Sequence, residues 1–297
     1  MVKKPNVAGS FYPASAEELS EMLNKFISEA EKELNDRSLA TTKTSPALRG
    51  DRTIPTKSGD RTFGIRPGEP KAIIVPHAGY IFSGKTAGFG FAALKQAISE
   101  KAKVKIVVIA PSHYAYLPGA ATAEFSAFQT PLGEIPAKSL LSELTETKGI
   151  ISNQSEAYEQ EHALEVELPF LQKICANKDI VILPLLTGEC NPAELATALK
   201  PLLEEENTFL VISSDLSHFY NQGTAQRIDA ATCEAIQELN LEKIIRGEAC
   251  GKAGILTLIH LAKELNWKPQ QLYYDTSATA SGDTSSVVGY ASFAFLS

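Results

Sequence analysis

The chain has 297 residues, and its 28 Lys and Arg residues against 35 Asp and Glu residues give a formal net charge of −7. This acidic balance argues against a protein that binds nucleic acid or an anionic membrane with its whole surface. Apolar residues make up 44% of the chain and charged residues 21%, which excludes wholesale disorder. We therefore expect a globular protein with neither nucleic acid nor a membrane among its partners.

The sequence also bears on the compartment. No stretch approaches the roughly 20 consecutive apolar residues that span a bilayer. The four cysteines lack C-x-x-C spacing, and so few cysteines in a long chain indicate free thiols in a reducing environment. A cytoplasmic protein is the expectation.

The first predicted element is an amphipathic helix over residues 15–36, in which Leu19, Met22, Leu23 and Phe26 recur at helical spacing. From about residue 39 to residue 70 the composition shifts to Thr, Ser, Arg, Gly and Pro. Because only one helix precedes this stretch, it is unlike a linker between two domains. We predict a flexible surface insertion at about 39–70.

Beyond residue 70, short apolar runs rich in β-branched residues alternate with helical patterns. The runs cover residues 72–75, 106–110, 180–183 and 209–212, and the helical patterns lie near 83–98, 159–175, 192–204 and 224–239. Such alternation predicts an α/β fold with a mostly parallel central sheet flanked by helices. Late strands near 271–274 and 286–295 are expected at a sheet edge. We predict a single domain over residues 1–297.

Three of the five histidines, His77, His113 and His218, follow directly after a predicted strand. Asp215 precedes His218 in the same loop. In open α/β sheets the loops at the carboxyl ends of the strands form the ligand crevice, so we expect these side chains to share a site. Two imidazoles with one carboxylate suit non-haem iron(II), and a further histidine suits proton transfer. Spacing alone leaves open that each histidine is structural.

Two further residues have more than one interpretation. His162 shares a predicted helix face with Glu165, and either a position facing a substrate or an ordinary surface role fits it. Cys250 lies between small residues at a predicted helix start, where the helix terminus would favour a thiolate that binds metal or reacts. An inert buried thiol is the alternative for Cys250.

Residues 79–86 match the phosphate-binding pattern G-x-x-x-x-G-K-[ST] between a predicted strand and a predicted helix. The loop carries the bulky side chains of Tyr80, Ile81 and Phe82, which are poorly suited to a backbone cradle. We expect no nucleotide site here.

Five motifs together resemble the Memo family, whose microbial members are also called AmmeMemoRadiSam system protein B. In chain order they are VAGSFYP at residues 7–13, PHAGY at 76–80, PSH at 111–113, SSDLSH at 213–218 and CG at 250–251. The resemblance extends from residue 7 to residue 293, which is nearly the whole chain.

The resemblance implies a fold similar to class III extradiol dioxygenases, with a non-haem metal pocket. His77, His113 and Cys250 would be the metal ligands, and Asp215 and His218 would line the same pocket. We predict that both are catalytic residues: Asp215 binds the metal or orients a ligand, and His218 transfers protons or contacts the substrate. Iron(II) is the expected metal. Copper, which is linked to animal members of the family, and zinc are the alternatives.

The predicted function is that of a metal-dependent oxidoreductase or dioxygenase-like enzyme acting on an unidentified small molecule. Cys250 stands where a dioxygenase would use a carboxylate, so ring cleavage does not follow from the resemblance. The alternative is a non-catalytic module that holds a peptide or protein partner in the same pocket. A zinc hydrolase is a third option, because His and Cys also bind zinc.

Overall fold

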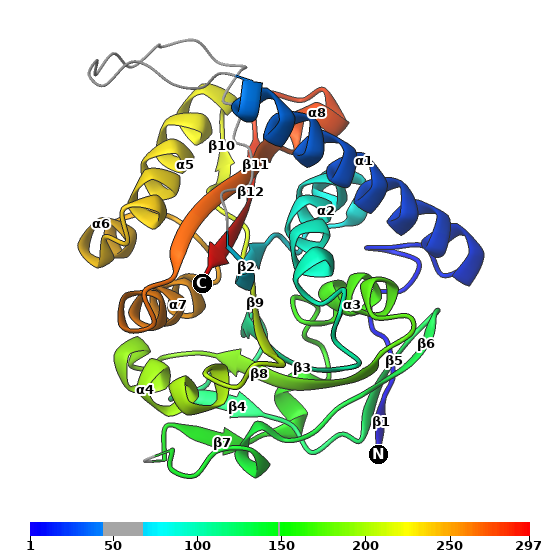
Figure 1. Ribbon diagram of the computed structural model, residues 1–297, viewed down its shortest axis with the longest axis vertical. Coiled ribbons are helices and arrows are strands. Elements are labelled where there is room, and N and C mark those ends of the chain that lie inside the picture. The colour runs from blue at the N-terminus through cyan, green and yellow to red at the C-terminus, as the bar shows by residue number, and fades with distance from the viewer. Residues whose placement is uncertain (44–67, 148) are drawn as a thin grey trace.

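The computed structural model describes residues 1–43, 68–147 and 149–297, and it shows a mixed α/β fold built on a nine-stranded sheet (Figure 1). Eight strands lie side by side, and the ninth pairs with the second of them. In spatial order they are β10 (His218–Tyr220), β12 (Val287–Leu296), β2 (Pro70–Val75), β9 (Thr208–Ser213), β3 (Lys103–Pro111), β8 (Asp179–Thr187), β4 (Ala120–Thr122) and β7 (Ile151–Asn153), with β11 (Lys268–Thr276) paired to β12.

The sheet is mixed, which corrects the expectation of a mostly parallel one. β2, β9, β3 and β8 are parallel neighbours, as the apolar runs predicted. β12 is antiparallel to β2, β10 and β11, and β4 is antiparallel to β8. The segment that joins β11 to β12 contains only one short helix, α8 (Ala278–Ser281), and so short a connection favours antiparallel pairing.

Helices cover both faces of the sheet, and alternate residues of β2 pack into the two layers. Ile73 and Val75 belong to one apolar core and Ala72 and Ile74 to the other. The first layer holds α1 (Ala16–Lys43), α2 (Tyr80–Ala97) and α3 (Leu168–Ile174); the second holds α4 (Pro192–Leu203), α5 (Gln222–Gln237), α6 (Leu241–Arg246) and α7 (Lys252–Glu264). Short 3₁₀ helices cover Leu140–Ser142, Ser155–Tyr158 and Glu165–Glu167. Among the described helices, none is both long and apolar enough to cross a membrane.

Helix α1 is longer than predicted, since it runs to Lys43 and so takes in the first residues of the predicted insertion at about 39–70. Pro70, the last residue of that stretch, opens β2. The greater part of the predicted insertion, residues 44–67, lies outside the described residues.

Close packing of α2 against α1 accounts for the pattern that mimics a phosphate-binding loop. A Cβ at Gly84 would lie 2.4 Å from the ring of Phe26, and one at Gly88 would lie 2.8 Å from the carbonyl oxygen of the same residue. Lys85 Nζ lies 5.0 Å from the centre of the Tyr273 ring. Gly84 of the pattern and Gly88 just beyond it therefore allow the close approach of two helices, and the lysine lies over an aromatic ring.

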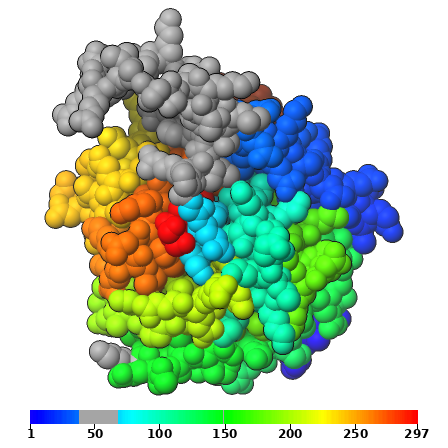
Figure 2. All heavy atoms as spheres, viewed as in Figure 1, coloured from blue at the N-terminus to red at the C-terminus, as the bar shows by residue number. Residues whose placement is uncertain are grey.

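A small sheet and the C-terminal strand complete the fold. The small sheet consists of β1 (Val2–Lys3), β5 (Ala127–Thr130) and β6 (Gly133–Pro136). At the other end of the chain, the Ser297 N–H donates to the carbonyl of Glu69 just before β2. Figure 2 shows these last residues, in red, at the surface beside the start of β2 in cyan.

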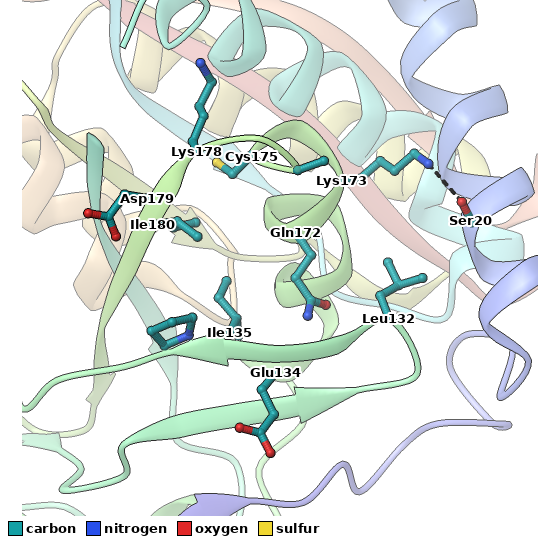
Figure 3. A pocket seen from close by; sticks show the side chains of 12 residues that line it. Ser20, Leu132, Glu134, Ile135, Gln172, Lys173, Cys175, Lys178, Asp179 and Ile180 are labelled. Atoms are coloured by element: carbon teal, nitrogen blue, oxygen red, sulfur yellow. Dashed lines mark hydrogen bonds between the residues drawn. The ribbon is translucent and has the colours of Figure 1, made fainter. Parts of the chain in front are cut away.

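A groove of about 480 Å³ opens between α1, the turn from β5 to β6 and α3 (Figure 3). Lys173 at its rim donates to Ser20 Oγ over 2.8 Å, and Gln172 donates to the carbonyl of Gly133. None of the predicted site residues lines this groove. The histidines therefore meet elsewhere in the fold.

Candidate metal centre

Three of the predicted site residues lie at the carboxyl ends of three neighbouring parallel strands. His77 follows β2, His113 follows β3, and Asp215 follows β9, which lies between those two strands. Cys250 comes from the loop before α7. The donor atoms of His77, His113 and Cys250 all lie within 4.8 Å of one another, and Cys250 Sγ is 3.4 Å from His77 Nε2. The arrangement matches the expected crevice of an open α/β sheet.

His77 is held rigidly, with one ring nitrogen facing the centre. Its backbone N–H donates to Asp215 Oδ1 at 2.9 Å, and its Nδ1 lies 2.7 Å from Ser213 Oγ. The side chain is only 3% exposed. Burial, reinforced by the neighbouring His113, lowers the pKa of His77 to about 3. The imidazole is therefore neutral at pH 7, which is the form that binds metals.

His113 is the most open of the three candidate ligands, with 30% of its side chain exposed. The buried carboxylate of Glu161 accepts its backbone N–H at 2.6 Å and lies 2.9 Å from its Nδ1. His113 Nε2 is thereby turned toward His77, whose ring centre is 5.3 Å away. His113 is therefore the candidate ligand that solvent reaches most readily.

Glu161 is better explained as a scaffold than as a metal ligand, although His113, Glu161 and His162 form a second group of donor atoms within 4.8 Å. Its carboxylate also accepts the N–H groups of His162 and Ala163, each at 2.9 Å. Burial favours the neutral acid, but the hydrogen bonds from His113 and Ala163 outweigh it and lower the pKa of Glu161. The Glu161 carboxylate is therefore ionised, and its oxygens already accept hydrogen bonds from the surrounding N–H groups.

Cys250 does not carry the thiolate that its place before a helix predicts. Burial, and then the charge of Asp215, raise the pKa of Cys250 to about 12. The helix dipole would lower the pKa of the Cys250 thiol, but this effect is weaker than that of burial. A divalent cation would reverse the balance, since a coordinating thiol is deprotonated.

Asp215 and His218, the predicted catalytic residues, lie beside the triad of candidate ligands. Their donor atoms are not among those that all lie within 4.8 Å of one another. Asp215 is buried, and its Oδ2 is 4.0 Å from His77 Nε2. Burial raises the pKa of Asp215. His218, in β10, is half-buried, and its charge when protonated would lower the pKa of both His77 and Asp215. Their catalytic roles stay predictions.

His162 lies beside the candidate metal centre. The sequence alone allowed either a position facing a substrate or an ordinary surface role for it. It does not share a helix face with Glu165, because the 3₁₀ helix begins only at Glu165 and α3 begins at Leu168. Its ring stacks on His113 with centres 4.8 Å apart and meets Phe11 at the same distance. Within the described residues its Nδ1 has no hydrogen-bond partner. Burial, and then His77, lower the pKa of His162 to about 4.

The donor set fits a divalent transition metal. Both histidines of the triad engage Nδ1 with an oxygen and leave Nε2 for the centre, which is the usual arrangement of metal-bound imidazoles. Two imidazoles and one thiol are ligands that suit iron, copper or zinc rather than magnesium or calcium. The sequence predicted these three candidate ligands but gave no indication of Ser213 and Glu161, which hold the two imidazoles.

Exposed apolar side chains are concentrated in the chain segments that carry His77, His113 and His218. Most of the large apolar side chains exposed on the described surface lie within five residues of His77, His113 or His218: Ile81, Phe82, Tyr114, Tyr116, Phe219 and Tyr220. The Tyr114 ring is 5.9 Å from that of His162. Phe219 is 78% exposed and has a left-handed φ of 65°, which is strained for an aromatic residue. We call these six residues the apolar rim.

Comparison with known proteins gives one consistent result. Residues 53–294 match the family described as Memo-like protein. The chain is 30% identical to a MEMO1 family protein of Nitrosopumilus maritimus, with all of both chains covered. It is 31% identical to one of Thermotoga maritima and 30% identical to one of Aquifex aeolicus, with 98% and 99% of this chain and 99% of each relative covered.

Proposed function

The chain belongs to the Memo-like family, and on that premise we propose that it is a metal-dependent oxidoreductase, dioxygenase-like in its pocket, acting on a small molecule. The ion is iron(II), held by His77, His113 and Cys250. Copper and zinc are the alternatives that experiment separates. The fold proposed for this pocket is similar to that of class III extradiol dioxygenases.

One observation carries the proposal: two imidazoles and a thiol from distant parts of the chain converge, and each imidazole is already oriented. His77 is fixed through Ser213 and His113 through Glu161, so neither ring has to be ordered when a metal arrives. Pre-orientation of this kind lowers the entropic cost of binding. Two ring nitrogens and a thiol thus face one point, with Cys250 Sγ 3.4 Å from His77 Nε2.

The surrounding residues divide the remaining tasks. A bound iron ion supplies redox chemistry and Lewis acidity. Asp215 holds the loop of His77 by accepting its N–H, and His218 at the edge of the centre transfers protons to or from the substrate. The open side of His113 admits the substrate, while the apolar rim keeps water from the approach.

Anaerobic titration with Fe(II), Cu(I) and Zn(II) tests the site. Wild type should bind one equivalent, and Cys250→Ser and His113→Ala should bind at least tenfold more weakly with an unchanged fold by circular dichroism. Equal affinity in all three proteins would overturn the site. A marked preference for Zn(II) would overturn the redox assignment and favour hydrolysis.

A second candidate, a non-catalytic module for a peptide or protein partner, is favoured by the apolar rim. Exposed apolar residues concentrated around one site are typical of binding surfaces. Oxygen consumption by the iron-loaded protein with candidate small molecules supports the enzyme. Peptide binding that is the same with and without metal supports the module instead.

A further inference from the structure

Ser213 lies at the meeting point of three polar groups behind His77. Its Oγ is 2.8 Å from the carbonyl oxygen of Ala163, 2.7 Å from Glu167 Oε1 and 2.7 Å from His77 Nδ1. Ser213 and Glu167 are both completely buried, so bulk solvent does not reach these contacts. The hydrogen bonds must be satisfied among the four groups themselves.

The donors and acceptors of this cluster admit one consistent arrangement. A serine hydroxyl has one proton to donate and two lone pairs to accept with. The carbonyl of Ala163 can only accept, so it takes the Ser213 proton. The other two neighbours must then donate to Ser213: His77 through Nδ1–H, and Glu167 through a carboxyl O–H.

The surroundings of Glu167 agree with a neutral side chain. Among the described residues, its Oε2 has no hydrogen-bond partner, which is tolerable for an acid but very unfavourable for a buried carboxylate. Burial raises the pKa of Glu167 well above its usual value, and the nearby charge of Asp215 acts in the same direction. No cation compensates it in the contacts of this cluster, whose only other titratable member is His77.

We propose that Glu167 is a neutral carboxylic acid that donates to Ser213, so that an uncharged pair backs His77 while the carboxylate of Glu161 backs His113. The two candidate ligands are then unequal. A carboxylate behind an imidazole raises its basicity, whereas a hydroxyl with a neutral acid behind it does not. Glu167 is thus a positioning residue for the proposed metal centre, and this inference rests on the proposed function.

A set of substitutions separates a neutral Glu167 from an ionised one, with Co(II) alone as the spectroscopic probe. Glu167→Gln keeps an uncharged side chain that can donate to Ser213 in nearly the same volume, so its affinity should stay within about threefold of wild type. Glu161→Gln removes the carboxylate behind His113 and should weaken binding tenfold or more. Ser213→Ala should weaken binding similarly, which shows that the assay senses what lies behind His77.

Loss of tenfold or more in Glu167→Gln, with its fold intact, would overturn the proposal, and so would wild-type affinity in Ser213→Ala. Infrared spectroscopy gives a readout that needs no metal. The metal-free protein at pH 7 should show the carbonyl band of a protonated carboxyl group that is missing in Glu167→Gln, and identical spectra would overturn the neutral acid. If wild type binds no metal, the proposed function fails while the infrared comparison still decides the state of Glu167.

Discussion

Cys250 and Asp215 are joined by two backbone contacts that run in opposite directions. The N–H of Cys250 donates to the carbonyl of Asp215 at 3.2 Å, and the N–H of Asp215 points at Cys250 Sγ over 3.1 Å. These main-chain contacts hold the sulfur 3.4 Å from His77 Nε2. These contacts tie the loop after β9 to the loop before α7.

Metal affinity should rise with pH because Cys250 must lose a proton when it binds. Its pKa is raised to about 12, so at pH 6 to 8 each unit of pH should strengthen Co(II) binding by up to tenfold. His77 adds nothing to this slope, since its lowered pKa of about 3 leaves it neutral throughout. Titrations at pH 6, 7 and 8 should show a clearly flatter dependence in Cys250→Ser, and equal slopes would remove the thiol from the ligand set.

Glu167→Gln should stabilise the protein at neutral pH but not in acid. The folded-state pKa of Glu167 is raised above its usual 4.5, so its contribution is fully present below that pH and is lost as the pH rises. Glutamine does not ionise, so the variant does not lose stability in this way as the pH rises. The gap in unfolding free energy between variant and wild type should therefore grow by about 1.4 kcal/mol per pH unit above 4.5, until the folded-state pKa is reached. Urea unfolding from pH 4 to 7 measures it, and a gap independent of pH contradicts it.

Glu165 should prove to be an anchor for the N-terminal segment. Its carboxylate accepts the N–H groups of Asn6 and Val7 at 2.7 and 3.0 Å and the hydroxyl of Tyr12 at 2.7 Å. Glu165→Gln replaces an acceptor by a donor that faces other donors, at a cost of about 1–3 kcal/mol in unfolding free energy. Tyr12→Phe, the milder control, removes only one bond. An N-terminal segment no more sensitive to proteolysis in Glu165→Gln than in wild type would refute the anchor.

Gly289→Ala should disturb the loop that carries Asp215 and His218. A Cβ at Gly289 would lie 1.9 Å from Asp229 Oδ2, and the same carboxylate accepts the Ser217 N–H at 3.0 Å. We expect a loss of about 1–3 kcal/mol in unfolding free energy, together with weaker metal binding. Gly223→Ala, in the exposed first turn of α5, is the matched control and should be neutral or slightly stabilising, because its Cβ would meet only Asn221 Oδ1 at an ordinary contact distance of 3.8 Å. Equal stability of the two variants would show that Asp229 can move without consequence.

The four parallel strands at the centre of the sheet were predictable because each is a continuous apolar run, which buried strands require. The arrangement of the strands beside these four was not predictable. β11 is at the margin of the sheet, as expected for the late strands, but β12 lies inside it, between β2 on one side and β10 and β11 on the other. Apolar composition indicates burial and does not say which strand supplies the partner.

The residues of the candidate site likewise fall into those that the sequence could predict and those that it could not. His77 and His113 were predictable because each follows an apolar run, and their family motifs added Cys250. Glu161 could not be found, since it meets His113 across 48 positions of sequence that the fold alone brings together. Ser213 and Glu167 also gave no signal, because a buried hydroxyl or acid has its role only through its neighbours.

Gly289 lies late in the chain, yet its backbone pins the loop that follows β9: Leu216 donates to its carbonyl, and its own N–H donates to Ser217. A chain that stops short of β12 contains His77, His113 and Cys250 but lacks the strand that pairs with the loop of Asp215. The final position of Asp215 beside these residues therefore depends on the docking of the C-terminal strand.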